Sequence, residues 1–481
     1  MSSKAQGLKQ RTVKAGSLVL IGYAFSQIIR FGGNLVLTRL LMPEMFGVMA
    51  IVNMMMIGLI MFSDVGLLQN IVQSDRGEDL DYLNTAWTIQ IVRGFVLFVI
   101  ALMISAGLYF LGQYGYVSPD TAYGNEQLPY IAATMSVVTV IAGYDSIHLL
   151  LLNRKLMMGK LVSIEVISQV IGLTIMIYLA WRYQNIWALV IGTIVSATIK
   201  LLLSHTMNLG ERCRLFWDKA AAHDIIHFGK WIFLTSILGF MTSQGDRIML
   251  GGLISAEQLG VYTVAFFLAT AVKDLLLRLI GSVFFPLLSE VSRDNFSRLE
   301  SVYYKLRFKI DMLAMFSAGF LYSTGSIIIS LLYDDRYKDA GWILQVLSLA
   351  LISVGYLMSG QCFVAIGKPK IDAVEKVIQL VSLYLLMPIG YYFYGMRGAI
   401  WGIAFASFSR IIVSFFLMKK YLFLRLRSEF VGLPFIVIGW LAGEGIRLII
   451  LNYDRLVEGL YSLLNKQEIL NYFREKVAIF L

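Results

Sequence analysis

Long apolar runs separated by short polar segments dominate the sequence. Each run extends for about 20 residues, the length that an α-helix needs to cross the hydrocarbon core of a bilayer. Within these runs, apolar and polar residues do not alternate with a period of two, as they would in the strands of a membrane β-barrel. The pattern therefore predicts an all-α polytopic membrane protein. We expect twelve clear transmembrane spans, at 16–38, 46–69, 87–111, 129–152, 161–181, 186–206, 228–252, 260–285, 310–333, 341–366, 371–394 and 398–418.

The end of the chain is harder to assign. The stretch 430–451 is apolar enough to form a thirteenth span, but it carries Glu444 and Arg447. The tail 452–481 mixes apolar and charged residues, so an interfacial amphipathic helix and a degenerate span both fit it. We therefore expect twelve to fourteen transmembrane helices, and the number of spans after residue 420 stays open.

Composition supports a membrane protein. Of the 481 residues, 58% are hydrophobic and only 15% are charged, whereas soluble domains average about 25% charged residues. The excess apolar surface must face lipid. The basic segment 1–14 leads directly into the first apolar run without a small-residue cleavage site, so we expect a retained first span rather than a secretory signal.

The Lys and Arg residues of the loops predict the orientation. Cytoplasmic loops carry the excess of these residues in membrane proteins. With the N-terminus in the cytoplasm, 24 of them fall in cytoplasmic segments and five fall outside, namely Arg39, Arg182, Arg336, Lys338 and Arg397. This distribution attributes the net charge of +10 to loops that face anionic membrane lipids, so no nucleic-acid partner is expected.

The two halves of the sequence resemble each other. Residues 32–48 match 245–261 at a shift of 213 positions, and each segment contains a glutamate three residues before a glycine. At a shift of 210, charged and polar residues also match: Lys160, Glu165, Gln169 and Lys200 correspond to Lys370, Glu375, Gln379 and Arg410.

A duplicated unit of six spans predicts two lobes with the same orientation. Such parallel repeats place a substrate cavity between two helix bundles, which rock to give alternating access. We expect an N-terminal lobe at 1–206, a cytoplasmic linker at 207–227, a C-terminal lobe at 228–420 and an extension at 421–481.

Basic residues inside the spans are candidates for substrate binding, because an ionisable side chain in a bilayer is costly unless it is paired or hydrated. Arg30, Arg247 and Arg410 lie deepest in their spans. An arginine suits phosphate because its planar guanidinium binds oxygens in pairs and stays charged. Arg93 and Lys200 lie nearer span ends, where they can line the same cavity or extend to the headgroups.

Acidic residues inside the spans are candidates for proton or ion coupling. Glu165 and Glu375 correspond across the repeat, and Asp64 and Asp246 are further candidates. Burial can raise the pKa of a carboxylate toward neutrality, which lets it carry a proton. The alternative is that these acidic and basic residues form structural pairs with one another, and the sequence leaves both interpretations open.

No catalytic residue, metal site or cofactor is expected. No GxSxG or phosphate-loop motif occurs. His223 and His227 have the spacing of a zinc-binding helix, but the glutamate that a metalloprotease needs after the first histidine is missing.

Several motifs carry a family resemblance. The run Leu-Thr-Arg-Leu-Leu-Met-Pro-Glu-Met-Phe-Gly at 37–47 resembles the first-loop signature of bacterial polysaccharide flippases. Segments that resemble the same family follow in family order, at 62–67, 69–73, 245–251, 259–262 and 285–289. By this resemblance the chain is identified as a member of the polysaccharide transporter branch of the multidrug/oligosaccharidyl-lipid/polysaccharide exporter superfamily.

The resemblance implies a function. Such proteins have two six-helix lobes and translocate undecaprenyl-pyrophosphate-linked oligosaccharides across the bacterial inner membrane, using an ion gradient and no covalent chemistry. Cavity arginines would hold the pyrophosphate, and other polysaccharide-assembly proteins would be partners. The resemblance identifies neither the glycan nor the ion.

Three alternatives remain from the sequence. A small-molecule or multidrug antiporter of the same superfamily would have the same fold, although deep arginines favour an anionic substrate. A polytopic polysaccharide polymerase or ligase would need a large external loop, and the longest one here is 112–128. A purely structural membrane protein would not require the charged residues inside the spans.

Overall fold

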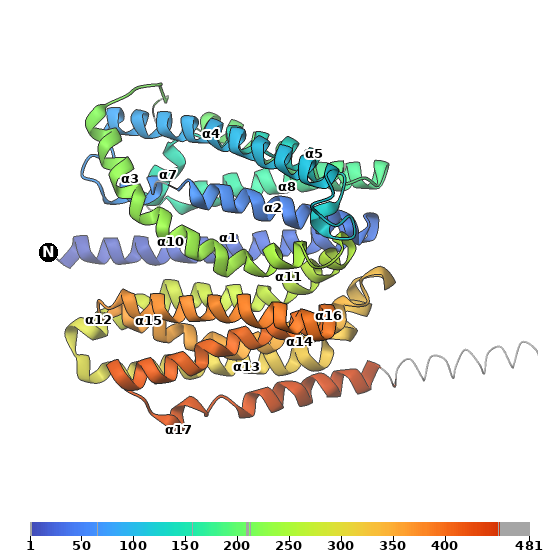
Figure 1. Cartoon of the computed structure of the whole chain (residues 1–481). Coiled ribbons are helices and arrows are strands. Elements are labelled where there is room, and N and C mark those ends of the chain that lie inside the picture. Colours follow the sequence, from blue (N-terminus) through green and yellow to red (C-terminus); the bar gives the residue numbers. More distant parts are fainter. Residues whose placement is uncertain are drawn as a thin grey trace, which may run out of the picture. The chain divides into compact units, whose positions relative to one another are not determined.

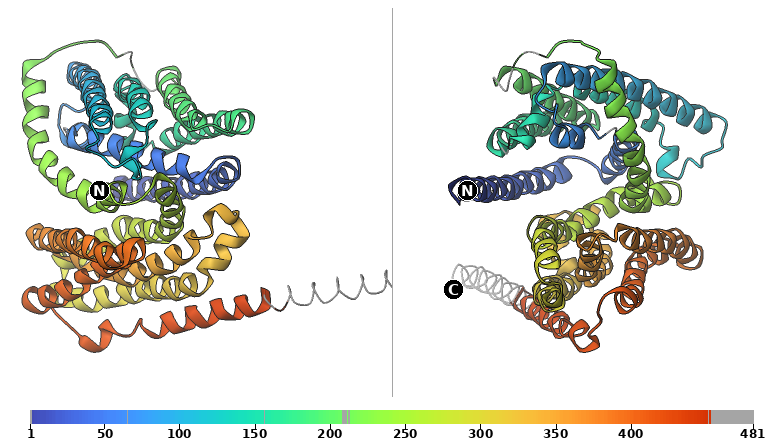
Figure 2. Two further views of the ribbon diagram at one scale, coloured as in Figure 1. Left: turned by 45° about the vertical axis from the view of Figure 1, so that its right-hand side comes forward. Right: turned by 90° about the vertical axis from the view of Figure 1, so that its left-hand side faces the viewer.

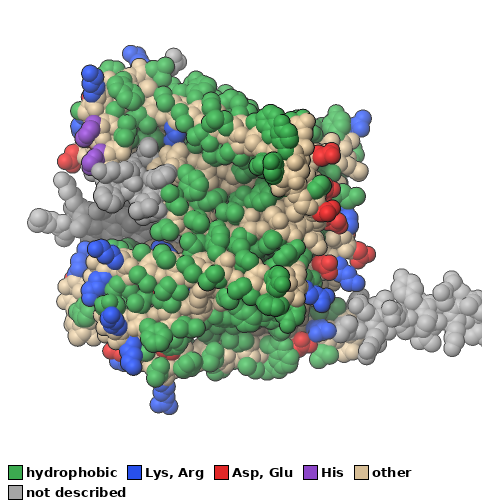
Figure 3. Space-filling view, viewed as in Figure 1, with side chains coloured by type: hydrophobic (Ala, Val, Ile, Leu, Met, Phe, Trp, Pro, Cys, Tyr) green, Lys and Arg blue, Asp and Glu red, His purple; other side chains and the backbone are tan. Residues whose placement is uncertain are grey.

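Helices form all the regular secondary structure in the part of the chain that the computed structural model describes (Figure 1). That part comprises residues 2–64, 66–155, 157–207, 211, 213–450 and 452. On the face that Figure 3 shows, hydrophobic side chains cover most of the middle, and most charged side chains lie toward two opposite edges. The prediction of an all-α membrane protein is confirmed.

The helices follow one another with short connections. The first half contains α1 (Ser2–Leu40), α2 (Pro43–Phe62), α3 (Leu67–Gln73), α4 (Leu80–Gln113), η1 (Ala122–Gly124), α5 (Leu128–Met135), α6 (Val137–Gly143), α7 (His148–Arg154), α8 (Met158–Tyr183), α9 (Trp187–Thr206) and α10 (Lys219–Gly251). The second half contains α11 (Ala256–Leu279), η2 (Ile280–Phe284), α12 (Phe285–Asp294), η3 (Phe296–Arg298), α13 (Leu299–Leu332), η4 (Asp335–Tyr337), α14 (Ala340–Ser348), η5 (Leu349–Tyr356), α15 (Leu357–Ala365), α16 (Pro369–Tyr421) and α17 (Leu426–Glu429). A further helix covers 434–450, and α10 curves along its length (Figure 2).

These elements form two compact units. Unit 1 contains the described residues up to Val264 together with Leu332–Asp339 and Ala373–Ser409. Unit 2 contains Ala265–Leu331, Ala340–Asp372 and the described residues from Arg410. The division into repeated lobes that the sequence suggests stays a prediction.

Nine helices in the described ranges are long and apolar enough to cross a membrane, and a tenth span results if one bent helix pair is included. The nine are Pro43–Phe62, Leu80–Gln113, Met158–Tyr183, Trp187–Thr206, Ala256–Leu279, Phe296–Leu332, Ala340–Ala365, Pro369–Tyr421 and Leu426–Ile450. The uncertain stretch 430–451 thus falls largely within one of these helices. The predictions for 453–481 lie outside the described residues.

The helix α16 contains two predicted spans. Its 53 residues would extend about 80 Å if straight, far more than a bilayer core. The chain reverses at Gly395, which has φ 57° and ψ −143°. On either side, Gly390 and Gly398 approach so closely that neither has room for a Cβ atom. The two arms correspond to the predicted spans 371–394 and 398–418.

One predicted span is broken. The pattern predicts a single helix over 129–152, but the structure forms α5, α6 and α7, with a bend of 61° before α7. The amide of Ser146 donates to Ser204 Oγ at 3.0 Å, and the carbonyl of Asp145 accepts from Trp87 Nε1 at 3.1 Å. Neighbouring helices therefore satisfy backbone groups that the break leaves without helical partners, which hydrocarbon could not do.

Two long helices begin at aspartate caps that one arginine joins. Asp79 accepts from the amide of Asp81 at the start of α4, and Asp218 accepts from the amide of Ala220 at the start of α10. Arg76 Nη2 lies 3.0 Å from Asp79 Oδ2 and 2.9 Å from Asp218 Oδ2. The hydrogen bond from Arg76 holds the pKa of Asp218 below its usual range and raises the pKa of Arg76.

The helices α2 and α11 cross at two glycines in unit 1. Gly47 lies against the carbonyl of Ala256, and Gly260 lies against the carbonyl of Pro43, with no room for a Cβ atom at either glycine. Positions 43 and 256, like 47 and 260, correspond at the shift of 213. The contact is therefore reciprocal, as it is around a two-fold axis.

Unit 2 contains a buried charged cluster. Arg307, Asp311 and Glu429 are each at most 2% exposed. Arg307 Nε lies 3.2 Å from Asp311 Oδ2, and Arg307 Nη1 lies 2.5 Å from Glu429 Oε2. The guanidinium stands 4.0 Å from the ring centre of Tyr356, and Tyr304 donates to Glu429 at 3.0 Å. This cluster joins α13 to α17.

Beyond the charged cluster, α13 also packs against the helix 434–450, and glycines lie at this contact. Gly319 packs against the backbone of Ile436, and Gly439 packs against the backbone of Phe316. Small residues let helices approach closely in membranes, where apolar side chains gain little by leaving lipid. The last described span is therefore held to unit 2 by buried charges at its start and by backbone contact along its length.

We expect Glu429→Gln to destabilise the protein by about 3 kcal/mol, because it breaks a buried ion pair and leaves Arg307 with one carboxylate. The matched control is Glu300→Gln, which breaks the more exposed Arg425–Glu300 pair and should cost about 1 kcal/mol or less. Thermal unfolding of the purified protein, followed by tryptophan fluorescence, measures both. Equal unfolding temperatures for the two variants would contradict a stabilising role for the cluster.

We expect Gly47→Ala to lower the unfolding temperature, because its Cβ would meet the carbonyl of Ala256 and force α2 and α11 apart. Overpacking of this kind costs about 1–3 kcal/mol. Gly32→Ala is the control, since a Cβ there meets nothing within 4 Å. The same thermal assay applies, and a Gly47→Ala protein as stable as the Gly32→Ala protein would show that the crossing is not tight.

Candidate functional site

A polar stripe follows one face of α1. Tyr23, Gln27, Arg30 and Asn34 recur at intervals of four, three and four residues, which places them on one side of a helix. Gln27 Nε2 donates to the hydroxyl of Tyr23 at 3.0 Å, and Tyr333 donates to Asn34 Oδ1 at 2.9 Å. Arg30 is exposed, and its side chain forms no hydrogen bond or ion pair with the described residues. The stripe thus presents a charged side chain that the protein itself does not neutralise.

An arginine from a distant segment fixes the C-terminal end of α1. Arg336 Nη2 donates to the carbonyls of Thr38 at 3.0 Å and Arg39 at 3.1 Å, and Arg336 Nη1 donates to the carbonyl of Leu41 at 3.3 Å. A cation at this position also complements the helix dipole. Asp334 pairs with the same guanidinium, which lowers the pKa of Asp334 and raises that of Arg336. These bonds fix the C-terminal end of α1 to the segment that contains Arg336.

Asp246 on α10 is a buried carboxylate with a tyrosine partner. Its side chain is 5% exposed, and its Oδ2 accepts a short hydrogen bond from the hydroxyl of Tyr262 on α11. The ring of Tyr384, from the first arm of α16, lies against the neighbouring Gly245. Three helices of unit 1 therefore meet at one titratable group.

The other deep arginines differ in environment. Arg247 is half-buried, and its Nη1 donates to Gln244 Oε1 at 2.8 Å. At the repeat shift it corresponds to Asn34, a member of the α1 stripe. Arg410 on α16 is 4% exposed. Arg247 therefore remains accessible, whereas Arg410 is enclosed.

The predicted residues near span ends have structural partners. Arg93 Nε donates to Ser63 Oγ at 2.8 Å, and Arg93 Nη2 donates to the carbonyl of Ile60 at 3.0 Å, so Arg93 caps the end of α2. Lys200 Nζ lies 2.9 Å from Asp145 Oδ2. The geometry of Arg93 and Lys200 therefore agrees with the interpretation that they form structural pairs.

The predicted carboxylates do not gather at one place. Asp64 lies at the end of α2 next to the Arg93 contact, where its Oδ1 accepts from the amide of Gly66 at 2.9 Å. Glu165 is exposed on α8, whereas its repeat counterpart Glu375 is fully buried on α16. The matched glutamates therefore have different surroundings.

Two features escaped the sequence prediction. Tyr262 lies within a family motif, and its spacing from Asp246 on two adjacent helices could have suggested a pair. The buried cluster was missed because Arg307 resembles a loop cation, and only Asp311, four residues later, gives a local signal. Glu429, its other partner, is far away in the sequence.

In the described ranges, no three His, Cys, Asp or Glu side chains come close enough to hold a metal ion. The rings of His223 and His227 stack with their centres 5.7 Å apart.

Known proteins resemble this chain in sequence and in fold. A family model described as polysaccharide biosynthesis protein matches residues 36–342. The lipopolysaccharide biosynthesis protein WzxC of Escherichia coli (strain K12) is 21% identical over 426 residues, which are 86% of this chain and 82% of WzxC.

Solved structures show the same fold at low sequence identity. The lipid II flippase MurJ, in an inward closed conformation, has a TM-score of 0.67 and 14% identity over 90% of this chain and 99% of MurJ. An inward-facing multidrug resistance transporter of the MATE family, in the MOP superfamily, has a TM-score of 0.64 and 16% identity over 82% of this chain and 94% of the transporter.

These findings confirm the family resemblance that the sequence motifs suggested. The matched residues include the glycine crossing of α2 and α11 and the Asp246–Tyr262 pair, whereas the α1 stripe lies before the first matched residue. The chain therefore belongs to the polysaccharide biosynthesis protein family and is a multi-pass membrane protein with the fold of the MurJ and MATE transporters.

Proposed function

We propose that this protein is a flippase that moves an undecaprenyl-pyrophosphate-linked oligosaccharide across the bacterial inner membrane by alternating access. The N-terminus lies in the cytoplasm in this proposal, as the loop charges predict. The observation that carries it is Arg30, an exposed cation without a protein partner among the described residues.

An arginine in an apolar helix cannot face hydrocarbon without a cost of several kcal/mol. The other side chains of the stripe, Tyr23, Gln27 and Asn34, are polar, and placing them against hydrocarbon also costs free energy. The stripe is therefore expected to line a hydrated cavity. A guanidinium in such a cavity binds phosphate oxygens in pairs through charge-assisted hydrogen bonds, which suits a pyrophosphate group.

Family membership supports a glycan as the other part of the cargo. The chain belongs to a polysaccharide biosynthesis family, and MurJ, which shares its fold, is named as a lipid II flippase. A lipid-linked oligosaccharide combines a glycan, a pyrophosphate and a polyprenyl chain. A transporter that binds the polar part in a cavity can leave the chain in the bilayer.

We assign the pyrophosphate contact to Arg30 and Arg247. Arg30 is exposed, and Arg247 is half-buried at the repeat-related position of the stripe. Arg93 and Lys200 have partners at helix ends, and Arg410 is enclosed, so their expected part is structural.

We assign coupling to protonation of Asp246. This carboxylate is buried, in contrast to Glu165, and it bonds across α10 and α11 to Tyr262. Adding a proton removes its charge and makes it a hydrogen-bond donor, which changes the bond between the two helices. Because α11 also forms the glycine crossing with α2, this bond is well placed to link protonation to helix movement.

A multidrug antiporter is the second candidate, since a MATE transporter has the same fold. The exposed arginine on α1 favours an anionic cargo over cationic drugs.

Transfer of a fluorescent undecaprenyl-pyrophosphate oligosaccharide between the leaflets of proteoliposomes tests the cargo. Arg30→Gln and Arg247→Gln should each slow transfer by roughly tenfold or more, because each removes a charge-assisted contact to phosphate. Arg182→Gln, at the exposed end of α8, is the control and should leave the rate unchanged. If the wild-type protein transfers no lipid under any ion gradient, the flippase proposal fails. A variant that transfers at the wild-type rate would remove that arginine from the site.

The same assay with an imposed pH gradient tests coupling. The gradient should accelerate the wild-type protein, and Asp246→Asn should abolish the acceleration, because an amide cannot bind and release the proton. Asp120→Asn, on an exposed loop, is the control and should keep the acceleration. Continued acceleration of the Asp246→Asn protein would exclude Asp246 as the coupling group. A wild-type rate that follows a sodium gradient alone would exclude protons.

A further inference from the structure

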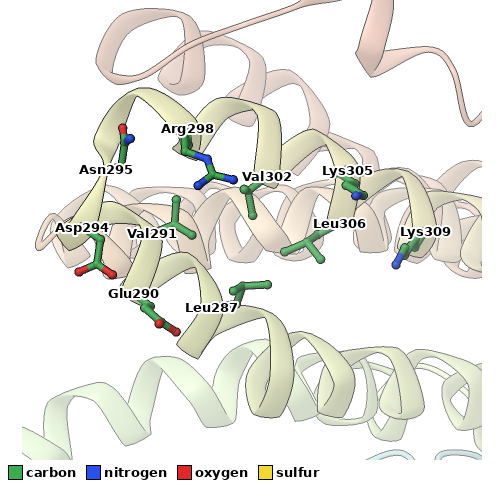
Figure 4. Close-up of a pocket in the computed structure, with 10 residues that line it drawn as sticks. All are labelled: Leu287, Glu290, Val291, Asp294, Asn295, Arg298, Val302, Lys305, Leu306 and Lys309. Atoms are coloured by element: carbon green, nitrogen blue, oxygen red, sulfur yellow. The ribbon is translucent and has the colours of Figure 1, made fainter.

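A pocket lies between α12 and the first turns of α13, where the chain turns at Asn295 (Figure 4). Its volume is about 440 Å³, which is within the range of small-molecule sites, about 300–1,000 Å³. All of its lining belongs to unit 2. The lining residues are Leu287, Glu290, Val291, Asp294, Asn295, Arg298, Val302, Lys305, Leu306 and Lys309.

The floor of the pocket is apolar. Val291 from α12 and Val302 and Leu306 from α13 point into the space between the two helices, and Leu287 continues this surface along α12 (Figure 4). Leu306 is 8% exposed and belongs to the hydrophobic core of unit 2. An apolar floor that continues into the core suits a hydrocarbon chain.

Three cations line the α13 side. Lys305 and Lys309 are four residues apart and share one face of α13, and Arg298, the last residue of η3, comes directly before the helix and lines the same pocket. All three are exposed. In the described structure, none of these three side chains forms a hydrogen bond or an ion pair. Their charge is therefore available to a ligand.

Two carboxylates line the opposite side. Glu290 and Asp294 lie on α12, one turn apart, and in the described structure neither forms an ion pair with the cations across the pocket. The cations exceed the carboxylates by one. The carboxylates can accept hydrogen bonds from hydroxyl or ammonium groups that are attached to a phosphate.

We infer that this pocket binds the phosphate of a lipid headgroup. The cations hold the phosphate, the carboxylates bind polar groups beside it, and the apolar floor receives the start of the chain. Two sources share this chemistry: a bilayer phospholipid and a polyprenyl pyrophosphate. The inference is independent of the proposed function, because the pocket and its charges are separate from Arg30, Arg247 and Asp246.

Native mass spectrometry of the full-length protein in detergent tests the pocket. The probes are dioleoyl phosphatidylglycerol, undecaprenyl pyrophosphate, and dioleoylglycerol, which has the same chains as the first probe but no phosphate. The pocket variant combines Arg298→Gln, Lys305→Gln and Lys309→Gln. The control combines Lys419→Gln, Lys420→Gln and Arg427→Gln, which remove the same charge from exposed residues of unit 2.

The pocket variant should bind a phosphate-bearing lipid roughly 100-fold more weakly than the control, since each basic residue contributes about 1 kcal/mol to binding of anionic lipid. Weaker binding of phosphatidylglycerol alone identifies a phospholipid site. Weaker binding of undecaprenyl pyrophosphate alone identifies a carrier site, and weaker binding of both identifies a general phosphate site. Equal affinities of the pocket variant and the control for both lipids would overturn the inference. Wild-type binding of dioleoylglycerol as tight as that of phosphatidylglycerol would also overturn it.

A separate result in proteoliposomes distinguishes this site from the transport site. Full transfer activity of the pocket variant, with loss of bound lipid, would support a lipid site outside the proposed cargo cavity. Failure of the wild-type protein to transfer any lipid-linked oligosaccharide would refute the proposed function and leave the lipid-binding result unaffected.

Discussion

Hydrocarbon offers no hydrogen-bond partner, and most of this structure follows from that constraint. Where the helix breaks before α7, the released backbone groups bond to Trp87 and Ser204 on neighbouring helices. Where Arg307 is buried, two carboxylates and an aromatic ring surround it. Arg30 is different, because the described protein supplies it with no partner. The partner of the Arg30 guanidinium must therefore be water or a ligand.

The sequence predicts the fold well because each span must be apolar over the thickness of the bilayer, and this requirement is local. Even the two arms of α16, joined by a single glycine, are visible as two runs. The break in 129–152 is not visible, since the only proline of the segment, Pro129, lies in the first turn of α5, far from the bend, and the segment is apolar on both sides of the bend. It depends on Ser204, 58 positions away in the sequence. Contacts at such separations leave no periodic signal.

The site was harder to predict for a related reason. Residue type and depth identify a charge that needs a partner, but the partner usually comes from another helix. Lys200 is a cavity candidate by residue type and depth, and its partner Asp145 comes from a segment more than 50 residues earlier in the chain. Glu165 and Glu375 match in sequence, yet one is exposed and the other is enclosed. A match across the repeat therefore does not predict the surroundings of a residue. Only the structure distinguishes an exposed charged residue, such as Arg30, from one that is paired with another helix.

The crossing of α2 and α11 has a kinetic consequence. At Gly47 and Gly260 the two backbones meet directly, without side chains fitted between them. Helices that interdigitate through long side chains must change rotamers, one contact after another, before they separate. At a glycine crossing no rotamer has to change, and the contacts to be broken are weak ones between backbone atoms. Separation at this point therefore meets little friction, and the same two glycines that make the contact close also allow it to open quickly.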